Sequence, residues 1–348
     1  MNTAVLRRGA SVYAASILSA VRDYGAGTAV SVALALTALA INSWLGGPAM
    51  IHALLLGFVL RWAVSGRRFD AGIDFSAKTL LRLGVGLLGA GISFQQVLAL
   101  GPQVVALVAG GVVFTIILGL ICARLLGLGR DLGLLLGGAV AICGASAALA
   151  IASVLPKSER SDANTLLAVV GVTALSTIAM VLYPLASIAL VMSAKASGVF
   201  FGATIHDVAQ VVGAGYMISD HTGETATIVK LLRVGCLVPV VAAISLWTGN
   251  SHKDRTRSIG HLFPWFLGLF ILLSAVASLQ LVPNAIMDMV SSAAKILLLI
   301  AIAALGLKTS PSGLAKVGIK PVLVLAVATL GLALLVLTLL FFLPEHFA

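Results

Sequence analysis

The chain has 348 residues, of which 60% are hydrophobic and only 10% are charged. A soluble domain carries about 25% charged residues, so this chain has too few polar side chains to cover a surface that faces water. Apolar runs of about 20 residues, long enough to cross a bilayer, recur along the whole length. The composition excludes a soluble globular protein and predicts an all-α, polytopic membrane protein.

The formal net charge of +10 does not indicate a nucleic-acid partner. The cations recur between apolar runs instead of forming one stripe with interleaved aromatic residues, which is the distribution of the positive-inside rule. Cys122, Cys143 and Cys236 lie in apolar runs without CxxC spacing. We interpret them as small buried residues, and we expect no disulfide framework, metal site or cofactor.

Residues 1–45 are predicted to form an N-terminal segment outside the main body of the protein. Arg7 and Arg8 precede a short apolar stretch at 9–21, a pattern that loosely imitates a signal peptide, and Arg22 follows before the next apolar run. We favour an interfacial helix on the cytoplasmic side over a cleaved signal peptide. The first membrane span follows this helix and is predicted to be peripheral.

Eleven apolar runs have about the length of a bilayer, so the sequence predicts about eleven transmembrane helices. Their approximate centres are Ala35, Leu56, Leu87, Phe114, Cys143, Ser176, Gln210, Val238, Phe270, Leu298 and Leu332. Of the 22 Lys and Arg residues, 16 lie in the N-terminal arm and in every second connection. The alternate connections hold only Lys157, Arg160 and Lys230. This bias predicts a cytoplasmic N-terminus and, with an odd number of spans, a periplasmic C-terminus.

Glycines interrupt the run around Cys143. Gly137 and Gly138 are interpreted as sites of close helix packing, because small residues let helix backbones approach each other. For the stretch that contains Gly144 and Ser146, a broken helix and close packing remain equally open, since non-helical backbone at membrane depth is tolerated where it lines a cavity.

The stretch 204–215 places His206, Asp207 and Gln210 among small and apolar residues. Lys230 and Arg233 follow at the head of another apolar run. Ionisable groups inside a membrane cost free energy, so such a cluster is by default a functional-site hypothesis.

Two pairs of short, similar segments indicate an internal repeat. Ala49–His52 resembles Ala203–His206, and Lys78–Gly84 resembles Lys230–Gly235, at offsets of 154 and 151 residues. By the charge bias, the matching pieces run in opposite directions across the membrane. We therefore predict a five-plus-five inverted repeat with halves at 46–192 and 193–348, which would build a site at the midplane. By order alone, the run around Cys143 would pair with the run around Leu298.

At these residues the chain resembles the bacterial YeiH-type sulfate exporter family, which is related to the bile acid, arsenite and riboflavin transporters. The resembling stretches are Ala141–Ala147, Ile205–Gln210, Lys230–Arg233 and Ala304–Ser310. The resemblance implies a ten-helix inverted repeat with crossing discontinuous helices, one extra N-terminal helix, and a location in the bacterial inner membrane.

Arg233 and Arg82 are the first candidates for contact with an anionic substrate, because a guanidinium presents a rigid fork of donors that suits oxyanions. The alternative is that both side chains extend toward water at the membrane interface, which is our interpretation of Lys230. If the helix breaks near Cys143 and Gly144, freed backbone N–H groups would hold an oxyanion, and Ser146 would add a hydroxyl.

Asp207 is the candidate for coupling to protons or sodium, and His206 would share the proton. The alternative is a structural Asp–Arg pair that joins two helices. Gln210 lies one helical turn from both residues and would complete a polar face.

These observations predict a secondary transporter for a small oxyanion, sulfate or sulfonate-like, that works by alternating access. The alternative is a cation/proton antiporter of similar architecture with Asp207 as the ion ligand. No HExxH, GxSxG or GxxxxGK[ST] pattern occurs, so neither a hydrolase nor an ATP-driven pump is expected. The oligomeric state is left open.

Overall fold

The computed structural model describes residues 3–64, 66–156, 158–248, 264–308 and 318–342. Every regular element in these ranges is a helix, which confirms the all-α class. Among the described residues, six helices are long and apolar enough to cross a membrane, and four shorter helices are also apolar. Packing divides the chain into two compact units, Met1–Val85 with Ser292–Thr309, and Gly86–Ser291 with Ser310–Ala348.

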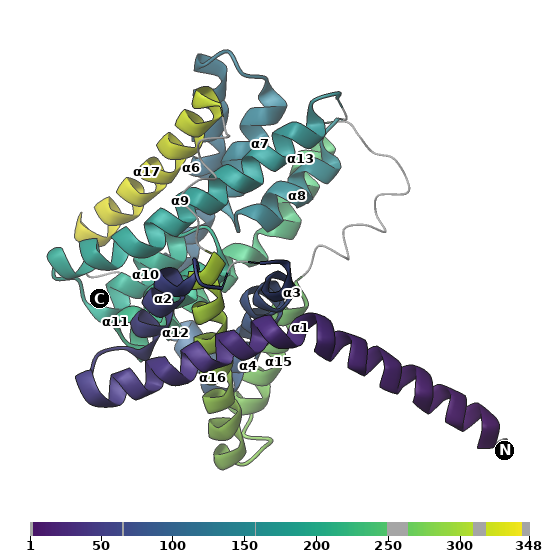
Figure 1. Cartoon of the computed structure of the whole chain (residues 1–348). Helices are drawn as coiled ribbons and strands as arrows, with labels where there is room; N and C mark the ends of the chain where they lie inside the picture. The colour runs from purple at the N-terminus through teal and green to yellow at the C-terminus, as the bar shows by residue number, and fades with distance from the viewer. Residues whose placement is uncertain (1–2, 65, 157, 249–263, 309–317, 343–348) are drawn as a thin grey trace. The chain divides into compact units, whose positions relative to one another are not determined.

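The first of these, unit 1, contains α1 and α2, which pack together, and the C-terminal part of α16 (Figure 1). Its elements are α1 (Thr3–Leu45), α2 (Ala49–Leu60), α3 (Arg67–Phe75), the π-helical turn η1 (Ser76–Leu80), α4 (Leu81–Leu87) as far as Val85, and α16 (Asn284–Lys308) from Ser292. The segment predicted as an interfacial helix continues without a break into the first span as α1. α2 and α16 touch through glycines, since a Cβ on Gly57 would lie 3.0 Å from Gly306 Cα.

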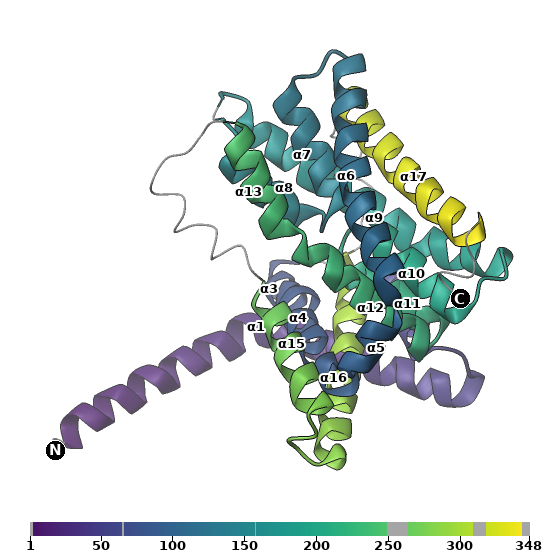
Figure 2. The same cartoon turned by 180° about the vertical axis from the view of Figure 1, so that it is seen from behind.

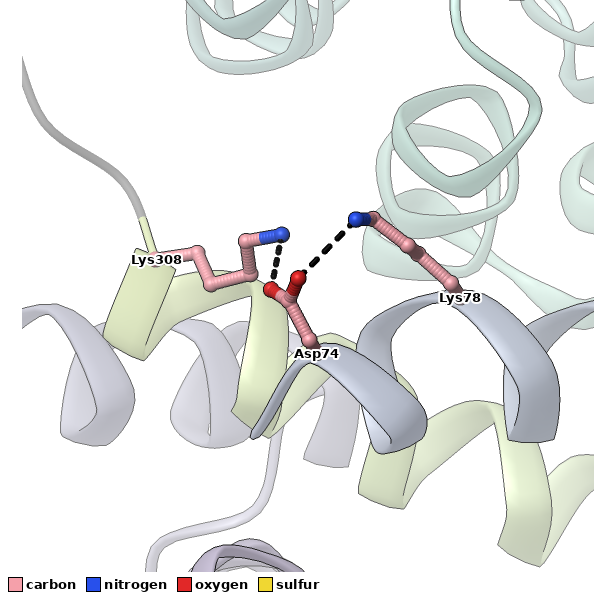
Figure 3. A network of polar contacts seen from close by, with 3 residues as sticks. All are labelled: Asp74, Lys78 and Lys308. Carbon is pink, nitrogen blue, oxygen red and sulfur yellow. Dashed lines mark hydrogen bonds and ion pairs between the residues drawn. The ribbon is translucent and has the colours of Figure 1, made fainter. Parts of the chain in front are cut away.

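Asp74 ties α3 to the end of α16 (Figure 3). Its carboxylate accepts hydrogen bonds from Lys78 Nζ at 2.9 Å and from Lys308 Nζ at 2.5 Å. Partial burial raises the pKa of Asp74, but the hydrogen bonds from the two lysines outweigh burial and hold the pKa below its usual value.

The Asp74→Asn variant should lose about 0.5–1 kcal/mol of unfolding free energy at neutral pH, a small effect because solvent screens exposed ion pairs. A carboxylate whose pKa is lowered stabilises the fold above its unfolded-state pKa, and that stabilisation is lost as pH falls through the folded-state pKa. Thermal unfolding in detergent should therefore separate variant from wild type at pH 7 and not at about pH 3. Asp23→Asn, at an exposed aspartate of α1, is the control; an equal loss there would contradict the role of the pairing.

Unit 2 holds the remaining helices. They are η2 (Leu88–Gly91), α5 (Phe94–Ala99), α6 (Gly101–Leu125), α7 (Arg130–Ala141), α8 (Ala145–Val154), α9 (Ser161–Ala189), α10 (Ala194–Thr204), α11 (Val208–Ile218), α12 (Asp220–Gly235), α13 (Leu237–Trp247), α15 (Trp265–Ser278), the start of α16, and α17 (Ile319–Phe342). Figure 2 shows α7, α8 and α13 together at one end of this unit.

α7 and α8 form a helical hairpin. The turn between them contains Gly144 at φ +64°, in the left-handed region that favours glycine. Gly138 of α7 packs against Ile151 of α8, as expected for two antiparallel helices. One cavity is lined by residues from the start of α7, the end of α8 and the start of α9: Asp131, Leu132, Leu135, Ala152, Leu155, Pro156, Ser158, Ser161, Asn164 and Thr165. The start of α7 and the end of α8 therefore lie next to each other.

α10 and α11 form a second hairpin, which packs on α12. A Cβ on Gly198, near the start of α10, would lie 3.0 Å from the carbonyl oxygen of Thr222, and one on Gly215, near the end of α11, would lie 3.2 Å from the same oxygen. The start of one helix and the end of the other thus reach the same turn of α12. The turn between α10 and α11 is extended at Ile205 and at Asp207.

The two hairpins approach the middle of α9 from its opposite ends. The start of α9 lies at the open end of α7–α8, whereas Ser187, near its end, is hydrogen-bonded at 2.6 Å to Ser197 of α10. At the middle of α9, Val172 lies beside Gly144, and Ser176 accepts a hydrogen bond from the second tip. The tips therefore meet halfway along α9.

This arrangement corrects two predictions. The runs centred on Cys143 and Gln210 were predicted to cross the membrane once each; both fold back, so the connection with Arg160 lies at the same end as Arg130. The run around Leu298 forms the continuous helix α16, and the second interruption lies between α10 and α11. The packing role of Gly137 and Gly138 is confirmed, since they contact α6 and α8. The repeat with halves at 46–192 and 193–348 stays a prediction.

Candidate functional site: the meeting point of two hairpin tips

The two tips are in direct contact. A Cβ on Gly144 would lie 3.6 Å from His206 Cβ and 3.7 Å from the His206 carbonyl oxygen. Each tip joins the C-terminal end of one helix to the N-terminal end of the next, so each brings backbone carbonyl and N–H groups that lack intrahelical partners. Buried in an apolar unit, these groups require partners.

Arg233 on α12 bonds to both tips. Its side chain is only 1% exposed. Nε donates to the carbonyl of Ala141 at 2.6 Å, and Nη2 donates to the carbonyl of Val140. Nη1 donates to the carbonyl of Ile205 at 3.0 Å and to that of Gly202 at 3.4 Å. One guanidinium therefore satisfies the last carbonyls of α7 and α10 together.

Lys230 lies one turn earlier on α12 and acts in the same way. Its side chain is fully buried, and Nζ donates to the carbonyl of Ile142 at 2.7 Å and to that of Ile205 at 3.0 Å. The prediction that Lys230 extends toward water is therefore wrong. Its charge lies at the contact between the hairpins.

The charges explain why two cations are placed here. The C-terminal end of a helix carries about −0.5 of an elementary charge, so bringing two such ends together is unfavourable without cations. Arg233 and Lys230 bind both ends and offset this charge. Contact of Arg233 with a substrate stays a prediction, because its hydrogen bonds in this structure go to backbone carbonyls.

The N–H groups of the second tip are satisfied by α9. Ser176 Oγ accepts hydrogen bonds from the backbone N–H groups of His206 at 3.2 Å and Asp207 at 3.0 Å. The next residue, Thr177, accepts a hydrogen bond from Gln210 Nε2 at 2.8 Å. These two hydroxyls are functional groups that were not predicted from the sequence. The signal that could have found them is that Ser176 and Thr177 are adjacent at the centre of a mainly apolar run.

Asp207 is the N-cap of α11. Its carboxylate accepts a hydrogen bond from the backbone N–H of Ala209 at 2.7 Å, and its side chain is half-buried. Among the described residues it forms no ion pair with Arg233, so the alternative of a structural Asp–Arg pair is wrong. The negative charge instead sits at the positive end of a helix, which stabilises it.

His206 and Gln210 lie fully or almost fully buried at the second tip, but not on one helical face as predicted, because His206 precedes α11. His206 Nε2 is hydrogen-bonded to Thr329 Oγ1 of α17 at 2.9 Å. His206 Nδ1 and Gln210 Oε1 have no hydrogen-bond partner within the part of the chain that the structure describes. The tip therefore keeps two buried polar atoms that are available to a ligand or to water.

The first tip differs from the second because the N-cap residue of its second helix is a glycine. The N-cap residue of α8 is Gly144, which has no side chain to cap the helix, and the N–H groups of Ala145 and Ser146 have no recorded acceptor among the described residues. Cys143 is buried, whereas the Ser146 side chain is exposed. The break predicted as one of two possibilities for this stretch is present.

Arg82 belongs to the other compact unit. It lies on α4 in unit 1 with an exposed side chain, and its role as an anion contact stays a prediction. No group of three or more His, Cys, Asp or Glu side chains that would hold a metal ion occurs among the residues searched, which are the described ones.

Comparison with known proteins places the chain in a family. The family model described as conserved hypothetical protein 698 matches residues 26–325. The UPF0324 membrane protein TauZ of Paracoccus denitrificans is 48% identical over 89% of this chain and 93% of its own length. A UPF0324 membrane protein of Chlorobaculum tepidum is 44% identical over 90% of this chain and 88% of its own. No solved structure matches.

These relatives agree with the YeiH-type family predicted from the sequence, and their names support location in a membrane. Since the family model covers most of the chain and the relatives align over nearly its whole length, the chain belongs to the UPF0324 family of membrane proteins.

Proposed function

We propose that the protein is a secondary transporter for a small oxyanion, sulfate or sulfonate-like, which binds where the two hairpin tips meet. The observation that carries the proposal is the asymmetry of the tips. The N-cap of α11 is the carboxylate of Asp207, whereas the N-cap of α8 is Gly144, and the free N–H groups of Ala145 and Ser146 lie in the same cluster as two buried cations. A ligand that supplies oxygen acceptors would bind these two N–H groups.

The backbone would contact the anion. The N–H groups of Ala145 and Ser146, preceded by Cys143 and Gly144, point along the N-terminal end of α8, and Ser146 adds a hydroxyl donor. His206 Nδ1 and Gln210 complete the binding surface from the second tip. In this proposal Arg233 holds both tips in place and contributes charge, and the substrate-binding role of Arg82 on α4 is left to experiment.

The charge of the cluster favours an anion over a cation. The partial charges of the two C-terminal and two N-terminal helix ends cancel. The remaining charges are the two positive ones of Arg233 and Lys230 and the negative one of Asp207. The net charge is then about +1 with an ionised Asp207 and about +2 with a protonated one. Protonation of Asp207 would therefore strengthen binding of a sulfonate or a divalent sulfate, and His206 would relay the proton. This links anion transport to protons; sodium bound at Asp207 would have the same effect.

The hairpins suggest how access alternates. The open end of α7–α8 carries three arginines, Arg124, Arg130 and Arg160, whereas that of α10–α11 carries one lysine, Lys195; acidic residues occur at both ends. The positive-inside rule then assigns the first end to the cytoplasm and the second to the periplasm. Folding two runs back removes two crossings, so a cytoplasmic N-terminus and a periplasmic C-terminus in the bacterial inner membrane are retained. Opening of either hairpin would expose the site to one side.

The name of one relative guides the choice of the first substrate to test. The name TauZ of the Paracoccus denitrificans relative hints at a taurine-related membrane function. A sulfonate is accordingly the first substrate to test. The membrane family and the absence of hydrolase and nucleotide-binding motifs in the sequence support a transporter over an enzyme.

A cation/proton antiporter is the second candidate. Asp207 and the unpaired Gln210 Oε1 are oxygen acceptors of the kind that bind sodium. Two neighbouring cations count against this function, because they would repel the ion.

Uptake by reconstituted vesicles tests the proposal. The purified full-length protein is supplied with labelled taurine, sulfate and sodium, with and without a pH gradient. We expect saturable uptake of a sulfonate or sulfate that an inward proton gradient accelerates. Gly144→Ala should lose uptake because of its φ of +64°, whereas Gly235→Ala, at a glycine with open space around it, should not. Sodium flux without any anion flux would reject the oxyanion transporter in favour of the antiporter.

A further inference from the structure

A cavity away from the hairpin tips lies at the open end of the α7–α8 hairpin, where α6, α7 and α13 end or begin. Its volume is about 520 Å³. It is lined by Leu120, Ile121, Arg124, Leu128, Arg130 and Trp247. The cavity thus combines two cations, one aromatic ring and an apolar wall, and none of these residues belongs to the proposed transport site.

The two arginines are available to a ligand. Both side chains are exposed, and no carboxylate within the described residues pairs with either. The Arg130 guanidinium lies 3.6 Å from the centre of the Trp247 ring. Stacking on the ring fixes the plane of the guanidinium while its N–H edge stays free to donate. Such an edge forms paired hydrogen bonds with phosphate oxygens.

The apolar wall continues along α6. Ile121 is 50% exposed and Leu125 is 79% exposed, although both belong to a helix of membrane-spanning length and hydropathy. Trp247 is 58% exposed, and tryptophan is enriched at the level of the lipid headgroups. In a membrane, acyl chains would cover this surface, and the arginines at the helix end would lie at headgroup depth.

We propose that this cavity binds one anionic phospholipid. The headgroup phosphate lies between Arg124 and Arg130, and the acyl chains run along Leu120 and Ile121 of α6. Basic pockets between membrane helices bind lipid headgroups in this way. A free phosphate ion would use the arginines but not the apolar wall, so the wall commits the site to a lipid.

Native mass spectrometry of the full-length protein in detergent tests the proposal, with phosphatidylglycerol and phosphatidylcholine as probes. Wild type should retain one phosphatidylglycerol in preference to phosphatidylcholine. Arg124→Gln and Arg130→Gln should each weaken this binding about fivefold, since each cation near an anionic lipid contributes about that factor. Arg160→Gln is the matched control, because Arg160 is an exposed arginine that does not line the cavity; its affinity should stay within about twofold of wild type.

Three outcomes would overturn the proposal. These are equal binding of both lipids, an equal loss in all three variants, or displacement of the lipid by millimolar inorganic phosphate. Thermal unfolding in phosphatidylcholine separates loss of the site from loss of the fold. The variants should unfold at the same temperature as wild type in phosphatidylcholine, and at a lower temperature than wild type only when phosphatidylglycerol is added. Arg130→Lys should bind with intermediate affinity, because it keeps the charge without the planar edge that stacks on Trp247.

Discussion

The Arg233→Ala variant should lose about 3–5 kcal/mol of unfolding free energy, the usual result of removing one partner from a buried charged network. The guanidinium bonds to the carbonyls of Val140, Ala141 and Ile205. Without it, the buried carbonyls of Val140 and Ala141 lose this donor, at a cost of about 1–3 kcal/mol each, whereas the Ile205 carbonyl keeps its hydrogen bond from Lys230. The two negative helix ends would also lose one of their two cations.

Equilibrium unfolding in mixed micelles measures this loss. Arg130→Ala is the matched control, because Arg130 is an exposed arginine of the same unit and should change stability by less than about 1 kcal/mol. The unfolding free energy of Arg233→Lys should lie between those of Arg233→Ala and wild type, since lysine keeps the charge but reaches fewer carbonyls. If Arg233→Ala were as stable as wild type but bound no anion, the guanidinium would belong to the substrate and not to the scaffold.

The Asp207→Asn variant should abolish the pH dependence of transport and keep the fold. Asparagine caps a helix as well as aspartate, so the bond to the Ala209 N–H is retained. Removal of the charge mimics a protonated Asp207. For charges about 8 Å apart at an effective dielectric constant of about 20, this is worth about 2 kcal/mol. Anion affinity at alkaline pH should therefore rise about 30-fold, to its value at acidic pH.

Anion binding measured between pH 5 and pH 9 checks this result. Asp207→Ser is a second capping variant without charge and should behave like Asp207→Asn. Asp131→Asn, at an exposed aspartate in the first turn of α7, should leave the pH profile unchanged. An unaltered profile in Asp207→Asn would leave Asp207 as a helix cap only, and the coupling group would lie elsewhere.

Composition and hydropathy were enough to predict the all-α membrane class, but not how the chain folds at its two interruptions. Residues 130–154 and 194–218 each have the length of a single membrane span, so a window of hydropathy does not separate one crossing from two half-length helices that turn back. At a rise of 1.5 Å per residue, α7 and α8 are only about 18 and 15 Å long. Gly144 marked the first turn; at the second, Asp207 was read as an intramembrane charge and not as an N-cap.

The sequence indicated which residues lie together at the candidate site, but not which atoms they contact. His206, Asp207, Gln210, Lys230, Arg233 and Gly144 do lie at the hairpin tips or on α12 beside them. A sequence does not show which acceptor a buried cation bonds to. Lys230 and Arg233 were expected near an anion or water, but they donate to backbone carbonyls. The position of Arg160 could have indicated that the run around Cys143 folds back. Placing its connection on the same side as Arg124 and Arg130 strengthens the positive-inside bias.

Labelling of single cysteines from either side of the membrane tests the two-hairpin arrangement most directly. In a variant without native cysteines, the informative changes are Gly129→Cys and Glu159→Cys at the ends of α7–α8, and Leu190→Cys and Asp220→Cys at the ends of α10–α11; all four positions are exposed. We predict that an impermeant maleimide labels the first pair only from the cytoplasm and the second pair only from the periplasm. Labelling of Gly129→Cys and Glu159→Cys from opposite sides would contradict the arrangement, since a helix that crosses the membrane places its two ends on different sides.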